Sequence, residues 1–210
     1  MKQEVASFLD YVAHSPTVFQ ATQQACDMLD AAGFTRLSEH EAWEILPGGR
    51  YYVTRNRSAL VAFAVPENGF THCQIVASHG DSPTFKLKAH AEGEAAGAYI
   101  RLDVEPYGGM IMSTWFDRPL SIAGRALVRE DGRLVTRLID LDRDAALIPN
   151  MPIHFNRDIN SGYSYNPQAD MLPLFGGKDA KGALAAEIAA KAGAKEEDVV
   201  ACDLFLYNRT

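Results

Sequence analysis

His79 and Asp81, separated by Gly80, are the residues whose types and spacing are best suited to chemistry. They follow an apolar run over residues 74–78 (QIVAS), which predicts a short strand buried on both faces. An imidazole binds a divalent metal through one ring nitrogen, while a nearby carboxylate accepts a hydrogen bond from the other. The pattern therefore fits a metal ligand, His79, oriented by Asp81. It fits at least as well a turn at the end of a strand whose histidine caps backbone groups, because a His-x-Asp spacing alone is a weak signal.

Ser82 offers a second kind of chemistry. The sequence Gly80-Asp81-Ser82 resembles the nucleophile block of GDS-type serine esterases, in which a distant histidine serves as the base. That family supplies its histidine from a D-x-x-H block near the C-terminus. Leu87 and Met151 stand three positions before the only later histidines, so the block is absent from these residues. The esterase is therefore the weaker alternative.

Helices and a hairpin are expected before these residues. Apolar residues recur at helical spacing over residues 5–12, and Ser15-Pro16-Thr17 then ends that helix and caps a second one. The second helix ends at Gly33, which suits the left-handed position after a helix. Residues 50–55 and 59–65 are β-rich and joined by a short turn, which predicts a hairpin. We expect residues 1–88 to form an α/β domain.

The composition changes after Lys88. Residues 89–177 predict several short strands and almost no helical periodicity, with a hairpin around Asp131-Gly132. A short Ala-rich helix is expected over residues 182–192 and a buried strand over residues 199–207. We therefore expect a separate β-rich domain over residues 89–198 and a return to the first domain over residues 199–210.

Six motifs in a fixed order resemble the aspartyl aminopeptidase family of dinuclear zinc metalloaminopeptidases, and together they cover essentially the whole chain. They are FLDYVAHSPTVFQA at 8–21, GGRYYVTRN at 48–56, ASHGDSPTFKLK at 77–88, YGGMIMSTWFDRPL at 107–120, IPNMPIHFNRDIN at 148–160 and DLFLYN at 203–208. Two positions depart from the family pattern, which has Thr where Gly80 stands and commonly Asp where Pro119 stands. Gly80 loosens the backbone between His79 and Asp81 without removing either functional group.

The resemblance implies a partial zinc-exopeptidase-like catalytic α/β domain interrupted by an inserted β-rich dimerisation domain. It implies that His79 is a zinc ligand and that Asp81 orients it. In this family His154 would reach from the dimerisation domain of one subunit into the active site of its partner. Taken alone, a histidine between Ile153 and Phe155 fits better a structural residue whose ring bonds to backbone.

The resemblance also implies the reaction. Two zinc ions per full-length subunit, bridged by a carboxylate and a water, would activate water to remove N-terminal residues, expected to be Asp or Glu, from peptides. The remaining ligands and the general-base Glu are expected after the strand that ends at Tyr207, and they have no counterparts before Thr210. A catalytic zinc usually holds three protein ligands, so we expect the 210-residue chain alone to be an inactive N-terminal fragment. A non-catalytic oligomerisation module is the second hypothesis.

Charge and cysteine content limit the classes of binding partner and site that are expected. The net charge of −7 and the pI near 5.3 argue against nucleic acid and anionic membrane surfaces, which need clustered Lys and Arg. Cys26, Cys73 and Cys202 lack CxxC spacing and favour neither a disulfide framework nor a thiolate zinc site. No signal peptide or membrane span is evident. We expect a cytoplasmic protein that acts on peptides and self-associates as a dimer and higher homo-oligomer.

Overall fold

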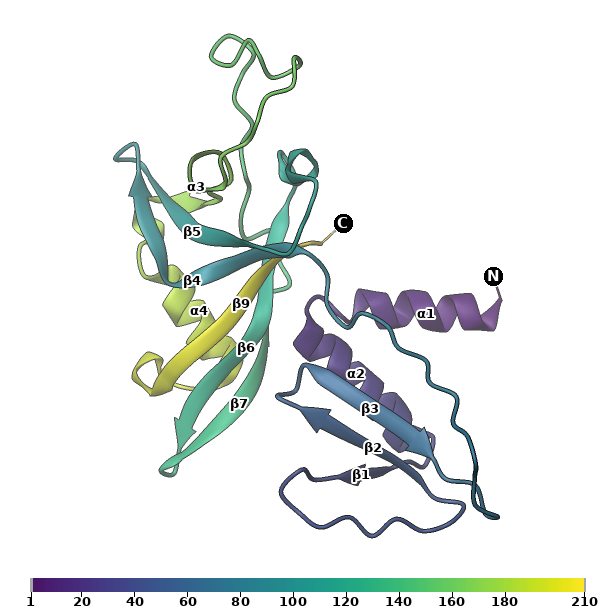
Figure 1. Ribbon diagram of the computed structural model, residues 1–210. Helices are drawn as coiled ribbons and strands as arrows, with labels where there is room; N and C mark the ends of the chain where they lie inside the picture. The colour runs from purple at the N-terminus through teal and green to yellow at the C-terminus, as the bar shows by residue number, and fades with distance from the viewer. Residues whose placement is uncertain (1, 210) are drawn as a thin grey trace. The chain divides into compact units, whose positions relative to one another are not determined.

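The structure, a computed structural model, describes residues 2–209 and divides into two compact units, which we name unit 1 (Met1–Ser82) and unit 2 (Pro83–Thr210). Unit 1 contains two helices and a small sheet, and unit 2 is built on a larger sheet (Figure 1). Within residues 2–209, none of the helices has the length and apolar character needed to cross a membrane. The mixed α/β architecture agrees with the fold class expected from the sequence.

The two opening helices of unit 1 are confirmed. Helix α1 spans Gln3–Ala13, and α2 spans Val18–Ala31. The Thr17 hydroxyl accepts a hydrogen bond from the Phe19 N–H at 3.3 Å and so caps α2. After α2, Gly33 has φ +77° and donates to the Asp30 carbonyl, while the next N–H reaches back to the carbonyl of Leu29. This pattern closes the helix as a Schellman motif, which requires the left-handed conformation that glycine adopts freely.

The sheet of unit 1 has the order β1-β2-β3, with bounds Thr35–Leu37, Arg50–Arg55 and Ala59–Ala64. Strands β2 and β3 form the expected antiparallel hairpin, and β1 pairs with β2 in parallel. Helix α2 lies along this sheet (Figure 1) and contacts β2 and β3. The Tyr52 ring is fully buried between them, and its hydroxyl donates to Asp30 of α2 at 2.7 Å.

The prediction of a strand over residues 74–78 is wrong. Residues 65–83 form an extended segment that belongs to neither sheet, and Ile75 and Val76 are 83% and 97% exposed. A β-strand is held by hydrogen bonds to neighbouring strands, and none of the described strands pairs with this segment. The apolar run therefore indicated side chains suited to burial, and it did not specify a pairing partner.

Unit 2 is built on a six-stranded sheet of order β7-β6-β9-β4-β5-β8, in which every neighbouring pair is antiparallel. The strands are β4 Thr84–Ala95, β5 Tyr99–Tyr107, β6 Leu120–Glu130, β7 Arg133–Asp140, β8 Leu174–Gly177 and β9 Val199–Asn208. Strands β6 and β7 form the expected hairpin around Asp131 and Gly132, both of which have positive φ. One short α-helix and three 3₁₀ turns connect the strands: α3 Pro167–Asp170, η1 Met112–Trp115, η2 Lys178–Ala180 and η3 Glu196–Asp198.

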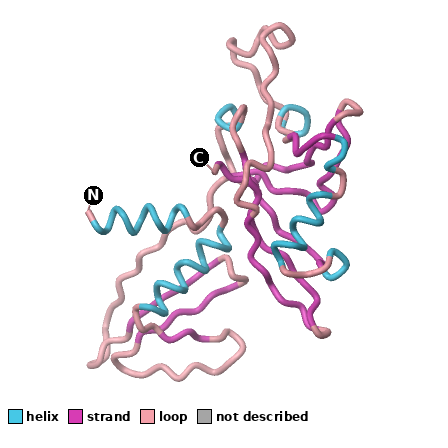
Figure 2. The backbone as a smooth tube through the Cα atoms, turned by 180° about the vertical axis from the view of Figure 1, so that it is seen from behind, coloured by secondary structure: helices cyan, strands magenta, loops and turns pink. Residues whose placement is uncertain are grey.

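Helix α4, Ala183–Ala192, covers one face of this sheet (Figure 2). Its side chains Leu184, Ile188 and Ala192 enter a core that includes fully buried residues of five strands: Phe85, Ile100, Leu102, Leu120, Ile122, Ile139 and Leu206. The carboxylate of Glu92 accepts hydrogen bonds from the N–H groups of Gly182 and Leu184 at 2.6 and 3.0 Å. A negative group at the helix N-terminus satisfies free amides there and so fixes α4 to β4.

The two units do not divide where we expected the domain boundaries. The expected boundary between Lys88 and Ala89 falls inside β4, which is one continuous strand, and the chain divides after Ser82 instead. Strand β9, expected to return to the first domain, lies between β6 and β4 in the sheet of unit 2. These pairings join residues far apart in the chain, so local composition does not reveal them.

Candidate metal site and the His154 loop

His79 and Asp81 form a hydrogen-bonded pair in the extended segment that ends unit 1. The distance from His79 Nδ1 to Asp81 Oδ1 is 2.7 Å. Side chains at positions i and i+2 of an extended backbone point to the same side, which explains how this spacing brings the two groups together. The His79 side chain is 89% exposed, whereas that of Asp81 is 27% exposed. The sequence therefore identified a pair that the structure joins.

The hydrogen bond sets the chemistry available to the imidazole. A carboxylate at this distance accepts a proton held on Nδ1, and the neutral ring then presents the Nε2 lone pair away from Asp81. Such a ring is suited to donate Nε2 to a zinc ion. Among residues 2–209, however, no three His, Cys, Asp or Glu side chains gather closely enough to hold a metal ion. The donors present fit one zinc ligand with its carboxylate partner and do not make a complete metal site.

Ser82 shows no arrangement typical of a serine nucleophile. Its side chain is exposed, and the neighbouring imidazole of His79 is hydrogen-bonded to Asp81. In the described part of the chain, no hydrogen bond connects Ser82 to a histidine. A serine esterase requires such a base next to its nucleophile, so the geometry gives no support to that alternative.

His154 lies in unit 2, in a long loop over residues 149–166 that we name the His154 loop. The loop extends away from the sheet (Figure 1), and His154 is exposed in it. Three apolar neighbours are also exposed, Met151 at 56%, Ile153 at 47% and Phe155 at 81%. The sequence alone favoured a structural residue whose ring bonds to backbone, but among the described residues no hydrogen bond joins the exposed His154 ring to a backbone group.

Two contacts of the His154 loop were not predicted. The carboxylate of Asp117 accepts a hydrogen bond from the N–H of Asn150 at 3.0 Å, and the carboxylate of Asp170 accepts one from the N–H of Asn166 at 2.7 Å. Asp117 belongs to the motif at 107–120, but it carries no spacing signal of its own. Asp170 also has no spacing signal. The bonds to Asn150 and Asn166 both depend on how the ends of the loop meet the rest of unit 2, which the sequence does not specify.

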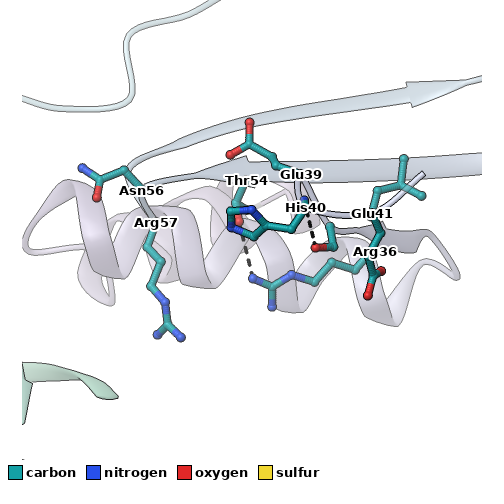
Figure 3. A pocket seen from close by; sticks show the side chains of 9 residues that line it. Arg36, Glu39, His40, Glu41, Thr54, Asn56 and Arg57 are labelled. Carbon is teal, nitrogen blue, oxygen red and sulfur yellow. Dashed lines mark hydrogen bonds between the residues drawn. The ribbon is translucent and has the colours of Figure 1, made fainter. Parts of the chain in front are cut away.

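A hollow of about 390 Å³ is present elsewhere in unit 1, beside β1 and the turn between β2 and β3 (Figure 3). Its lining includes the charged residues Arg36, Glu39, Glu41 and Arg57, together with His40. Neither His79 nor Asp81 lines it, and Glu39 is paired with Arg55 outside the hollow at 2.7 Å. We therefore give this hollow no part in the chemistry of the His79–Asp81 pair.

Comparison with known proteins assigns the chain to one family. The profile of a family described as aminopeptidase I zinc metalloprotease (M18) matches residues 11–210. A probable M18 family aminopeptidase 2 of Clostridium acetobutylicum is 41% identical over 221 residues, which cover 99% of this chain and 50% of that protein. The chain thus spans about half the length of the curated relatives it matches.

Solved structures match the fold over nearly the whole chain. A chain of the cryo-EM structure of the Ape4 and Nbr1 complex is 33% identical with a TM-score of 0.91, covering 98% of this chain and 44% of that one. The S. cerevisiae mApe1 dodecamer is 25% identical with a TM-score of 0.81, covering 99% of this chain and 48% of that one. Sequence and fold therefore lead to the same family.

Proposed function

Because this chain belongs to the M18 family of aminopeptidase I zinc metalloproteases, we propose that the whole protein removes N-terminal residues, preferentially Asp or Glu, from peptides. The observation that carries the proposal is the 2.7 Å hydrogen bond between His79 and Asp81. It supports a role for His79 as a zinc ligand, with Asp81 holding the ring in the tautomer that leaves Nε2 free. The preference for acidic residues follows from the resemblance to aspartyl aminopeptidases.

Zinc would polarise the scissile carbonyl and supply hydroxide at neutral pH from a bound water. We propose two ions per subunit, with His79 as the ligand that this part of the chain provides. A catalytic zinc usually needs three protein ligands, so residues 1–210 alone should not hydrolyse peptides. Asp81 would raise the basicity of the His79 imidazole without touching the ion.

We propose that His154 acts in the active site of a partner subunit. There its N–H would donate a hydrogen bond to the oxygen of the scissile carbonyl as negative charge develops, a contribution of roughly 3–4 kcal/mol when one such donor is lost. The exposure of His154 and its apolar neighbours supports this role, because an exposed apolar group of residues is typical of a surface that another protein covers.

Self-association follows from the same proposal. The S. cerevisiae relative is a dodecamer, and we propose that unit 2 is the dimerisation domain of a cytoplasmic homo-oligomer. The six-stranded sheet has β7 and β8 as its outer strands. Outer strands carry unpaired backbone groups that pairing with a second copy satisfies. A strictly monomeric species in sedimentation at concentrations well above micromolar would count against this assignment.

The first test compares two histidines of the same segment in the full-length protein. His79→Ala should lower zinc content and abolish hydrolysis of Asp- and Glu-peptides. His72→Ala is the matched control and should leave both unchanged, since the His72 ring lies beside Thr71 and takes no part in the pair. Asp81→Asn should keep some of the zinc and lose much of the rate. Full zinc content and normal turnover in His79→Ala would sink the assignment.

The second test asks whether His154 acts across subunits. An inactive His79→Ala variant and a His154→Ala variant with only weak residual turnover are mixed and allowed to exchange subunits. Mixed dimers should contain one site with both histidines, so activity should reappear. No recovery after verified exchange, or normal turnover of His154→Ala alone, would return His154 to a structural role.

Two other functions are distinguishable by simple observations. A non-catalytic oligomerisation module would give a folded, metal-free oligomer with no peptidase activity in the full-length protein. A serine esterase would be labelled at Ser82 by a phosphonate. The family match supports neither outcome.

A further inference from the structure

The N-terminal end of the His154 loop is fixed by one residue at two points. Asp117 donates its N–H to the carbonyl of Ile148 at 2.9 Å, and its carboxylate accepts the N–H of Asn150 at 3.0 Å. The side-chain oxygen of Asn150 in turn accepts the N–H of Met151 at 2.9 Å. These three hydrogen bonds therefore fix the backbone as far as Met151, which lies three residues before His154.

Beyond Met151 the loop depends on its own turns. Within the described chain, its backbone bonds are local, such as Phe155 N–H to the Pro152 carbonyl at 2.9 Å and Ser161 N–H to the Asp158 carbonyl at 2.8 Å. The other end is held by Asp170, which accepts from the Tyr163 hydroxyl and the Asn166 N–H at 3.1 and 2.7 Å. The direction in which the loop leaves unit 2 is thus set at its two ends.

The backbone of Asp117 indicates that this anchor is specific. Its φ is +56°, in the left-handed region that most side chains avoid and that Asp and Asn tolerate better than others. Glycine would adopt this conformation without strain, yet it has no carboxylate for the Asn150 amide. Asp is therefore a residue that meets both requirements, and the conformational cost is offset by a bond to the loop that carries His154.

We propose that Asp117 is a positioning residue for His154, which aims the His154 loop through the Asn150 amide and itself does not touch substrate. The inference rests on the proposed function of His154. It gives the left-handed backbone of Asp117 a part in orienting the His154 loop, while neither Asp117 nor Asn150 takes part in the reaction.

The test uses three variants of the full-length protein. Asp117→Gly keeps the backbone conformation and removes the acceptor, so folding should survive while Asn150 loses its partner. Asp117→Asn keeps both the left-handed tolerance and an oxygen acceptor. Asp131→Gly is the matched control, because Asp131 has φ +47° in the turn between β6 and β7, away from the His154 loop in the topology of unit 2.

The first readout is hydrogen exchange, which does not depend on activity. In Asp117→Gly the Asn150 amide should exchange about tenfold faster, as expected for the loss of one hydrogen bond, and amides through Phe155 should lose protection with it. Asp117→Asn and Asp131→Gly should exchange at the wild-type rate in this loop. Unchanged protection of Asn150 in Asp117→Gly would overturn the anchor itself.

The second readout is a double-mutant comparison of turnover. Asp117→Gly should lower kcat about tenfold with little change in KM, and it should cause no further loss when His154 is already Ala. An equal loss in the His154→Ala background would mean that Asp117 acts by another route, and the proposal would be wrong. Normal turnover of His154→Ala alone would instead remove the proposed role of His154, so the two failures are distinguishable.

Discussion

Units 1 and 2 use similar apolar residues but bury them to very different extents. In unit 2, β6 and β9 contribute Leu120, Ile122 and Leu206 to a continuous core, and each is at most 1% exposed. In unit 1, α1 has no buried residue, and Phe8 in its apolar stripe is 62% exposed. The buried apolar cluster of the described chain consists of unit 2 residues alone.

This difference in the burial of apolar residues indicates that the two units are stabilised by different means. The large buried core of unit 2 gains free energy from removing apolar surface from water. Unit 1 depends more on helix caps, the hairpin and the contacts of α2 with its sheet, and it keeps an apolar surface that its own residues do not cover. We therefore expect unit 1 to open at lower denaturant than unit 2.

The largest expected effect comes from Gly124, at the centre of unit 2. Its φ is +154°, and a Cβ there would lie 2.0 Å from the Asp203 carbonyl oxygen, so Gly124→Ala must push β6 and β9 apart. We expect a loss of about 3 kcal/mol in the free energy of unfolding, measured by urea titration. Gly109→Ala is the control, since a Cβ at Gly109 meets nothing within 4 Å. Equal stability of the two variants would show that the β6–β9 pairing is not the centre of unit 2.

A second prediction measures the difference between the units directly. Cys26 in α2 is 4% exposed, and burial raises the pKa of its thiol, so it should react slowly with a thiol reagent in the native state. Exposed Cys73 should react first. With rising urea, Cys26 should become reactive while the amides of β6 and β9 are still protected from exchange, a gap of about 2 kcal/mol in opening free energy. Simultaneous loss of both protections would contradict the comparison.

The third prediction concerns Asp203 of β9. Burial raises the pKa of its carboxyl, but hydrogen bonds from Arg125 and Lys86 outweigh burial and hold that pKa below its ordinary value. A carboxyl with a lowered pKa in the folded state stabilises the fold above its unfolded pKa of about 4, and the benefit disappears as the pH falls below that value. Wild-type stability should therefore fall by about 1 kcal/mol more than that of Asp203→Asn between pH 6 and pH 3. If the free energy of unfolding fell equally with pH in both proteins, the bonds from Arg125 and Lys86 to Asp203 would contribute nothing to the stability of unit 2.

The local elements of both units could be predicted because each has its signal within a few residues. Thr17 and Gly33 mark the ends of α2, and Asp131-Gly132 marks the β6–β7 turn. The order of the six strands could not be predicted, since β9 is separated from its partners β6 and β4 by most of unit 2. Residues 74–78 were misassigned because an apolar run reports suitability for burial, and no described strand pairs with it.

In the candidate site, too, the local features could be predicted and the long-range ones could not. The His79–Asp81 pair was predictable, because residues i and i+2 of an extended chain place their side chains on the same side. The exposure of His154 was not, because a short apolar context is the same in a buried strand and in an exposed loop. The contact between Asp117 and Asn150 joins positions 33 residues apart through a left-handed backbone, and neither feature has a sequence signal. The metal role of His79 stays a prediction.

The smallest expected effect concerns Gly80, where the resemblance described above leads one to expect Thr. Its φ lies outside the left-handed region, and a Cβ there would be 3.8 Å from Val18 Cγ2 and 3.9 Å from the Ser58 carbonyl oxygen. Both are ordinary contacts, so the segment does not need glycine at this position. Gly80→Ala should therefore stabilise unit 1 by about 0.4–1 kcal/mol, because the unfolded chain loses backbone freedom. Slower labelling of Cys26 at intermediate urea would measure this gain. Gly33→Ala is the contrasting control: its φ of +77° is strained for alanine, so Cys26 should be labelled faster. If Gly80→Ala also accelerated labelling, the segment around His79 would need the freedom of glycine, and the space beside Val18 would be smaller than the structure gives.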